Sequence, residues 1–231
     1  MSRFKPRMDI LPTAQQRLWH ELAAAPGLGF VLYGGTAVAL RLGHRQSVDF
    51  DFFSDKPLDR MKIHDSFRFF ANATVVQDYQ NALTVLVAYG DSQHSHVKVS
   101  FFGMLGFGRV GRPDFTEDGV LQVACLDDLM ATKVKVILQR AEAKDYRDIA
   151  AMIKAGANLP RALAAACQFF GQAFQPSESL KALVYFSDGD LQTLTGDEKS
   201  TLVMAASAVR DLPDVAVLSK QLAVTNETAG N

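Results

Sequence analysis

Residues 31–54, VLYGGTAVALRLGHRQSVDFDFFS, guide the interpretation of the whole sequence. A short apolar run ends at Gly34 and Gly35, and Asp49 and Asp51 follow later with one phenylalanine between them. The apolar run predicts a buried strand, the glycines a tight turn, and the residues after them a short helix that ends at a glycine. The strict alternation around the aspartates predicts a second strand.

The composition is that of a folded chain with almost no net charge. Of 231 residues, 48% are hydrophobic, which is enough to bury a substantial core in one large domain or in a domain with a helical extension. Lys and Arg total 24 and Asp and Glu 25. A nucleic-acid partner would therefore have to bind a local basic patch.

Cysteine usage and hydropathy predict a cytoplasmic location. Cys125 and Cys167 stand far apart without CxxC spacing, which favours buried thiols over a disulfide framework or a zinc site. No stretch is apolar and free of charge over the length of a membrane span, and the basic N-terminal residues lack a signal-peptide pattern. We therefore expect no contact with a membrane.

Hydrophobic periodicity changes after residue 125. In residues 1–125, helical spacing alternates with runs of β-branched and aromatic residues, whereas in residues 126–231 the spacing is helical. We therefore predict an α+β core with a small mixed or antiparallel sheet, followed by a helical region that completes a cleft. Runs in the first half predict helices over residues 14–24 and 61–72, an antiparallel meander over 74–80, 82–89 and 96–102, and an irregular loop over 103–115.

The two aspartates of the second strand are candidate metal ligands. Successive side chains of a strand point to opposite faces, so Asp49 and Asp51 share one face, while Val48, Phe50 and Phe52 turn to the core. Two carboxylates about 7 Å apart repel each other unless a cation lies between them, and hard oxygen ligands suit Mg²⁺ together with substrate phosphates. A pair of solvated charges on an exposed strand is the alternative.

The glycine turn is a candidate phosphate site. Gly34 and Gly35 permit close approach of the backbone to a ligand, and a helix that begins near Thr36 offers N–H groups and a positive dipole end. Arg45 can grip phosphate oxygens, and the hydroxyl of Ser47, on the face of the aspartates, can donate to them. Together these residues predict a nucleoside triphosphate that is attacked in line, with metal ions on the attacking and leaving oxygens.

At this point the sequence resembles a known family. The segment YGGTAVALRLGHRQSVDFDFFS is similar to the first motif of the AbiEii/AbiGii-type toxin nucleotidyltransferases, within the polymerase-β-like superfamily. The later segment DDLMATKVKVILQRAEAKDYRDIAAMI is similar to the second motif, in which a helical lysine precedes an R-x(4)-D-x-x-D arrangement. The resemblance covers residues 33–153 and implies a polymerase-β-like fold and a nucleotidyltransferase activity.

The second motif turns charged side chains inward. Lys133 recurs with apolar residues at helical spacing, and Asp145 shares the apolar face of the next helix, with Asp148 at its border. Asp145 as a helix N-cap with Lys133 as its buried ion-pair partner is one reading. The resemblance implies another, with Lys133 on the triphosphate and Asp145 near the metal or the acceptor hydroxyl. Arg140 belongs to a solvated rim or faces an acidic acceptor such as RNA.

One departure from the superfamily concerns a third carboxylate. The superfamily usually carries it on a later strand beside the aspartate pair, where residues 96–102 offer Lys98 and Ser100 instead. Either Asp145 supplies the third acid, or only one of the two metal ions binds well.

The combined expectation is a Mg²⁺-dependent enzyme that transfers a nucleoside monophosphate from an NTP to a hydroxyl. The toxin resemblance implies an RNA acceptor such as a tRNA 3′ end, and a cognate antitoxin as protein partner. Two alternatives stay open. One is a small-molecule acceptor, as in antibiotic-modifying nucleotidyltransferases, and the other is a nucleotide-binding regulatory module without catalysis.

Overall fold

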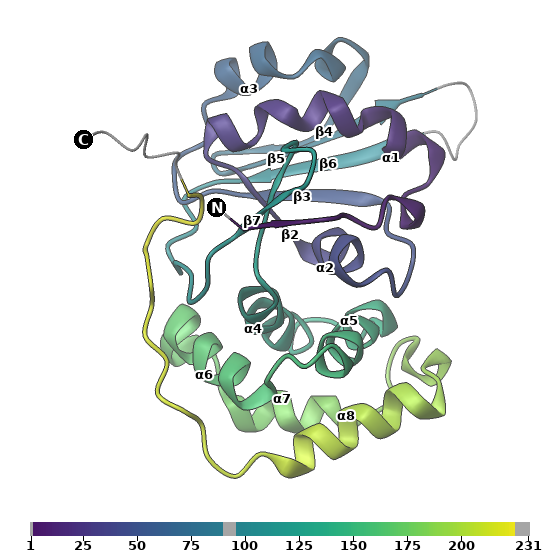
Figure 1. Cartoon of the computed structure of the whole chain (residues 1–231), viewed down its shortest axis with the longest axis vertical. Coiled ribbons are helices and arrows are strands. Elements are labelled where there is room, and N and C mark those ends of the chain that lie inside the picture. Colours follow the sequence, from purple (N-terminus) through teal and green to yellow (C-terminus); the bar gives the residue numbers. More distant parts are fainter. Residues whose placement is uncertain (1, 90–95, 225–231) are drawn as a thin grey trace.

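A single mixed sheet forms the centre of the upper part of the molecule in Figure 1. The computed structural model describes residues 2–89 and 96–224. Within them eight strands form one sheet in the order β1-β7-β8-β2-β3-β6-β5-β4. In that order the strands are Arg3–Phe4, Asp114–Thr116, Gln122–Val123, Val31–Tyr33, Asp49–Phe53, His96–Phe102, Ala82–Ala88 and Ala73–Tyr79.

The pairing of β3 places the aspartate strand in the interior of the sheet. β3 is antiparallel to β2 and parallel to β6, while β4, β5 and β6 form the antiparallel meander predicted from their sequence. The short strands β7 and β8 were not predicted. β7 ends the stretch that the glycines had indicated as an irregular loop, and both strands are too short for a recognisable alternation.

Helices cover both faces of the sheet (Figure 1). α1 and α3 lie on one face, and α2 lies on the other, above the layer that α4 to α8 form. The helix predicted over residues 14–24 is confirmed as helical, although it tightens to a 3₁₀ helix at Trp19–Ala24. The α-helices are α1 Thr13–Leu18, α2 Gly34–Leu42, α3 Arg60–Ser66, α4 Leu126–Val136, α5 Ala143–Lys154, α6 Leu159–Phe170, α7 Pro176–Leu183 and α8 Gly196–Ala208.

Alternation along β3 separates a core face from a polar face, as predicted. Phe50 and Phe52 are completely buried. Phe50 packs on Trp19 with ring centroids 6.4 Å apart, and Phe52 stacks on Phe101 at 5.5 Å. The expectation that Val48 also turns to the core was wrong. The strand begins only at Asp49, and Val48 stands before it with 51% of its surface exposed.

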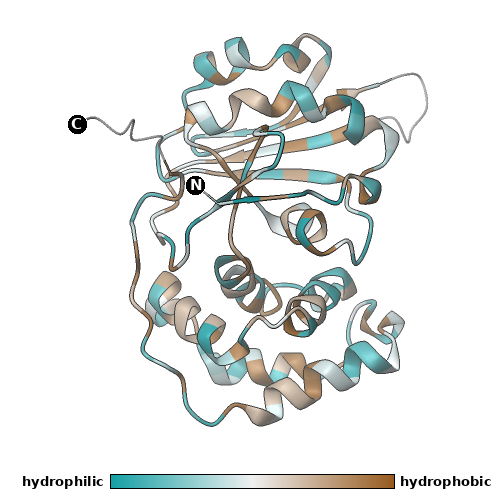
Figure 2. Cartoon of the chain, viewed as in Figure 1, coloured by the Kyte–Doolittle hydropathy of each residue, from teal (hydrophilic) through white to brown (hydrophobic). Residues whose placement is uncertain are grey.

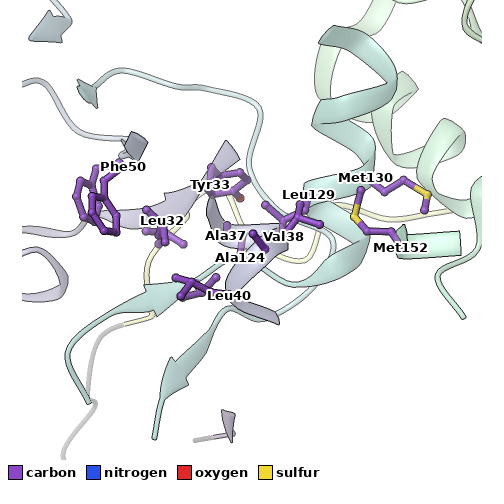
Figure 3. Packing of buried hydrophobic residues seen from close by; sticks show 14 of the residues in the cluster. Leu32, Tyr33, Ala37, Val38, Leu40, Phe50, Ala124, Leu129, Met130 and Met152 are labelled. Atoms are coloured by element: carbon purple, nitrogen blue, oxygen red, sulfur yellow. The ribbon is translucent and has the colours of Figure 1, made fainter. Parts of the chain in front are cut away.

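The hydrophobic core continues from the sheet into the helical layer. Figure 3 shows Leu32 and Tyr33 of β2, Val38 of α2, and Leu129 of α4, all of which belong to one buried cluster. In Figure 2 the brown of hydrophobic residues runs along the segment that leads from the sheet into α4, whereas the peripheral α3 carries much teal. The two halves therefore share one core.

The chain returns to the sheet after α8 (Figure 1). The amide of Leu222 donates to Asp55 Oδ1 at 3.0 Å, and the amide of Val224 donates to Gln122 Oε1 at 2.9 Å. α4 begins at Leu126, where the periodicity had changed. The division into two domains, residues 1–125 and 126–231, stays a prediction. The C-terminal residues Leu222 and Val224 belong to the second part but contact the first.

In residues 2–89 and 96–224, every helix is too short or too polar to span a bilayer.

The aromatic core around Phe101 gives a first test of the fold. Phe101 is fully buried and contacts the rings of Phe30 and Phe67 at 5.1 and 5.3 Å between centroids. Replacement by alanine should lower the free energy of unfolding by about 3–5 kcal/mol, because it removes these contacts and leaves a cavity. Tyr79→Ala is the control, since that side chain is 69% exposed, and should change it by less than about 0.5 kcal/mol. Equal losses in urea denaturation would contradict this core.

Candidate active site

A cavity of about 720 Å³ lies between the polar face of the sheet and the helical layer. Strands β3, β5 and β6 contribute to one wall, and the start of α2 and the end of α4 contribute to the others. Most of the predicted site residues line it. They are Gly34, Gly35, Thr36, Arg45, Ser47, Asp49, Asp51, Ser100, Lys133 and Arg140. Asp145 and Asp148 are fully buried behind this lining.

The carboxylates of Asp49 and Asp51 face the cavity side by side along β3. The parallel pairing of β3 with β6 places Lys98 beside Asp49 and Ser100 beside Asp51. Lys98 Nζ lies 2.8 Å from Asp49 Oδ2. Burial raises the pKa of Asp51, and the charge of Asp49 adds to this rise, while Lys98, Lys133 and Ser100 oppose it. A cation at this pair would relieve the repulsion that the two carboxylates exert on each other.

The two glycines make room for side chains as well as for a ligand. Gly34 has a φ of 72°, and a Cβ there would lie 2.6 Å from Asp51 Oδ2. A Cβ on Gly35 would lie 2.2 Å from Arg45 Nη2. The start of α2 has no side-chain cap from its N-cap residue, Tyr33, and its first residues Gly34 and Gly35 line the cavity, so the positive end of the helix lies at the cavity wall. This is the arrangement in which helix N-termini bind anions.

Thr36 and Ser47 connect the start of α2 to the start of β3. Thr36 Oγ1 and Ser47 Oγ are 2.7 Å apart, and the threonine hydroxyl donates to the main-chain carbonyl of Asp49. The hydroxyls thus position the first aspartate relative to the helix. That Ser47 donates to phosphate oxygens, and that Thr36 belongs to the nucleotide site, stay predictions.

Lys133 of α4 is held between two buried carboxylates. Its Nζ lies 2.5 Å from Asp145 Oδ1 and 2.7 Å from Asp148 Oδ2. The lysine side chain is 6% exposed and the two aspartates are not exposed at all. Of the two readings of the sequence, the ion pair is therefore observed, but Asp145 is not the N-cap. That position belongs to Glu142, and Asp145 stands in the first turn of α5.

Three further side chains complete this ion network on either side. Arg45 donates from Nε and Nη2 to Asp148 at 2.7 and 2.9 Å, and His44 Nε2 lies 2.7 Å from the same carboxylate. Arg140 Nε donates to Asp145 at 2.8 Å. Burial alone would raise the pKa of Asp148, but Lys133, His44 and Arg45 hold it well below its ordinary value. The pKa of Asp145 is likewise lowered, since Arg140 and Lys133 outweigh burial.

These contacts bear on the predicted roles. Arg45, expected on phosphate oxygens, uses its Nε and Nη2 for Asp148, and its Nη1 donates to the carbonyl of Gln46 at 2.9 Å. Asp145, expected near a metal or an acceptor, faces Lys133 and Arg140. The roles of all these residues toward a substrate stay predictions. Sequence reasoning missed His44 as a partner of Asp148, although it stands next to Arg45.

An aromatic end of the cavity was also missed. Beyond Asp51 on the same face of β3 comes Phe53, and its register partner on β6 is Phe102. Phe107 and Phe170 line the cavity with them, their ring centroids 5.9 Å apart. The signal was present in the alternation of residues 96–102 and 49–53, which continues from polar to aromatic side chains on one face.

The donor set of the strand pair fits a hard divalent cation. Residues 2–89 and 96–224 contain no group of three or more His, Cys, Asp and Glu arranged to hold a metal ion. Two carboxylates with a neighbouring hydroxyl, that of Ser100, are oxygen ligands of the kind Mg²⁺ takes when substrate phosphates and water complete its shell.

A family model described as "Nucleotidyl transferase AbiEii toxin, Type IV TA system" matches residues 17–214. The chain belongs to the AbiEii family. Among curated proteins it is 30% identical over 122 residues to the uncharacterized protein aq_aa25 of Aquifex aeolicus (strain VF5). That match covers 52% of this chain and 55% of the relative, so the chain spans about half the length of the curated relative.

Among solved structures, the fold is similar to that of MenT4, a nucleotidyltransferase toxin from Mycobacterium tuberculosis H37Rv. The TM-score is 0.51 at 13% sequence identity, and the match covers 81% of this AbiEii-family chain and 85% of MenT4. The predicted α+β class is confirmed by the mixed sheet and by this likeness. The resemblance inferred from the two sequence motifs is confirmed by the family match.

The ion network predicts that replacing Lys133 strongly lowers the stability of the fold. Lys133→Met should lower the free energy of unfolding by about 3 kcal/mol, since it leaves two buried carboxylates with fewer cations. Lys135→Met on the same helix is the control, because the ammonium of Lys135 donates to the main-chain carbonyl of Ala173 and forms no ion pair with a described carboxylate. In the double variant Lys133→Met/Asp145→Asn the loss should be smaller than the sum of the single losses by about 1 kcal/mol or more. Additive losses in urea denaturation would show that the pair is not coupled.

The pH dependence of the stability difference between wild type and Lys133→Met checks the same ion pairs. Because the folded-state pKa values of Asp145 and Asp148 are lowered, their contribution to stability is present above pH of about 4 and is lost as the pH falls through the lowered values. Lys133 also lowers the pKa of Asp51, so the part of its stabilisation that acts through Asp51 is likewise lost as that carboxylate becomes protonated at low pH. The difference in Tm between wild type and Lys133→Met should therefore be full at neutral pH and narrow below pH of about 4. A difference independent of pH would contradict the ionic origin.

Proposed function

We propose that this protein transfers a nucleoside monophosphate from an NTP to a hydroxyl acceptor, with Mg²⁺ as cofactor and pyrophosphate as leaving group. The observation that carries the proposal is the position of Asp49 and Asp51 next to the start of α2 in one cavity. A metal site and an anion site then lie side by side, as a metal-bound triphosphate requires. Membership of the AbiEii family supports the reaction class.

The charges of the cavity suit a triphosphate. Asp49 and Asp51 would hold Mg²⁺, which would supply a positive charge to the attacking and leaving oxygens. The amides at Gly34 and Gly35 and the helix dipole would bind phosphate oxygens. Six cationic side chains line the cavity against two aspartates, so the wall attracts an anion. They are Arg45, Lys98, Lys133, Lys135, Arg140 and Lys144.

Lys133 has two tasks in this proposal. Its ammonium pairs with Asp145 and Asp148, which fixes α4 against α5, and it also lines the cavity, so its positive charge reaches the phosphate site. Arg45 and Arg140 extend the same field on either side. In this proposal Asp145 and Asp148 act as positioning residues that keep the cations in place.

The aromatic end would receive the nucleoside. Phe53 and Phe102 follow Asp51 and Ser100 along their strands, which places flat apolar rings one step beyond the carboxylates. Nucleobases stack on such rings with little sequence preference.

The acceptor in this proposal is an RNA, such as the 3′ end of a tRNA. Lys135, Arg140 and Lys144 lie at the helical side of the cavity, where they form a local basic rim in a chain of nearly neutral net charge. The family model describes a toxin of a toxin–antitoxin system, which supports a cognate antitoxin in the same cytoplasm. A small-molecule acceptor is the second candidate, favoured by the near-neutral charge.

The carboxylate pair gives the test of the reaction class. Asp49→Asn and Asp51→Asn should each abolish transfer from labelled NTP while the Tm changes little, because each removes one charge from a repelling pair. Asp49 also loses its exposed ion pair with Lys98, which is worth about 1 kcal/mol or less. Asp65→Asn on α3, 76% exposed, is the matched control and should keep full activity. Active variants with a lower Tm would indicate a structural pair and a binding module without catalysis.

The acceptor is identified by the labelled product. Wild type is incubated with Mg²⁺, each labelled NTP in turn, and either total RNA or a panel of hydroxylated small molecules such as aminoglycosides. Label in RNA that a 3′-exonuclease removes supports the RNA acceptor. Label confined to the small molecules overturns it in favour of the second candidate.

A further inference from the structure

Lys98 contacts the acidic pair from the neighbouring strand. β3 and β6 are parallel and pair Asp49 with Lys98 in register, so the sheet itself fixes which lysine stands beside the carboxylate. The distance from Lys98 Nζ to Asp49 Oδ2 is 2.8 Å, and the two side chains are 42% and 34% exposed. The pair is thus open to the cavity, and a pair of such exposure separates readily.

The other cations of the cavity are engaged elsewhere. Among the described lining residues, Lys98 is the cation in ion-pair contact with either aspartate of β3. The others have different partners: Arg45 and Lys133 on Asp148, Arg140 on Asp145, Lys144 on Glu142, and Lys135 on the main chain of Ala173. Lys98 is therefore the cation that an incoming metal ion meets at Asp49.

We propose that Lys98 is a built-in counter-cation that competes with the divalent metal ion for Asp49, so that the metal ion binds together with the triphosphate and only weakly to the protein alone. This inference rests on the proposed function. The triphosphate brings negative charge into the cavity, and the ammonium, on a flexible stem with three rotatable donors, exchanges the carboxylate for a phosphate oxygen. Asp49 is then available to the metal ion. Lys98 acts here as a positioning residue that orders the two binding events.

The competition is measured with Mn²⁺ as the probe. Paramagnetic resonance of free Mn²⁺ gives its affinity for the full chain, first without nucleotide and then with a non-hydrolysable NTP analogue. Without nucleotide, Lys98→Met should bind Mn²⁺ about tenfold more tightly than wild type, because a competing charge is gone. With the analogue this advantage should vanish, so the coupling between metal and nucleotide falls about tenfold.

Matched variants keep the result interpretable. Lys98→Arg retains the charge and should resemble wild type, and Lys98→Gln repeats the charge removal with a polar side chain if the methionine variant folds poorly. Lys62→Met is the control, since this lysine of α3 pairs with Asp59, the N-cap residue of that helix, outside the cavity lining.

Two results overturn different statements. Mn²⁺ affinities of Lys98→Met and Lys98→Gln, measured without nucleotide, that lie within about twofold of wild type or are weaker overturn the competition. Equal Mn²⁺ affinity of wild type and Asp49→Asn, both with and without the analogue, removes the metal site itself and with it the proposed function. Because the second comparison does not involve Lys98, the two failures are distinguishable.

Discussion

The structure depends on Lys133 being held between Asp145 and Asp148. Both carboxylates are fully buried, and a buried carboxylate without a cation is costly, so α4 and α5 are restricted to positions that keep the ammonium between them. Arg45 extends the constraint to the loop before β3, because its guanidinium binds Asp148 through two hydrogen bonds. The helical layer and the sheet are thereby joined by charge as well as by the shared hydrophobic core.

This constraint reaches the candidate phosphate site through Gly35. A Cβ at that position would lie 2.2 Å from Arg45 Nη2 and 3.3 Å from Asp148 Oδ2, so the first turn of α2 lies directly against the ion network. Gly34 stands in the same relation to Asp51. Because neither glycine has a Cβ, the start of α2 can lie against Arg45 of the ion network at Gly35 and against the Asp51 carboxylate at Gly34. Its role in packing follows from these distances, whatever ligand the helix amides bind.

Local pattern was sufficient to predict the longer elements, but not the short strands β7 and β8 and not which elements contact each other. The alternation of residues 47–53 placed Asp49 and Asp51 on one face, and helical spacing turned Lys133 inward. Neither pattern specifies which groups meet, because Arg45 and Asp148 are 103 residues apart and are brought together only by the fold. The same reason explains why the return of residues near Leu222 to Asp55 was not predicted. The error at Val48 arose because the alternating pattern was extended to a residue before the start of the strand at Asp49.

The two pairs of aspartates differ in how completely their charge is compensated. Asp145 and Asp148 are inaccessible, and each accepts from at least two cationic or imidazole groups, with pKa values lowered by those partners. Asp49 and Asp51 face an open cavity, the first with a single exposed lysine and the second with its pKa raised by burial. A saturated carboxylate has no capacity left for a ligand, whereas an undercompensated one gains from any cation that arrives. Asp145 and Asp148 on α5 are therefore suited to a structural role. Asp49 and Asp51 on β3 are the pair that a cation from outside would stabilise most.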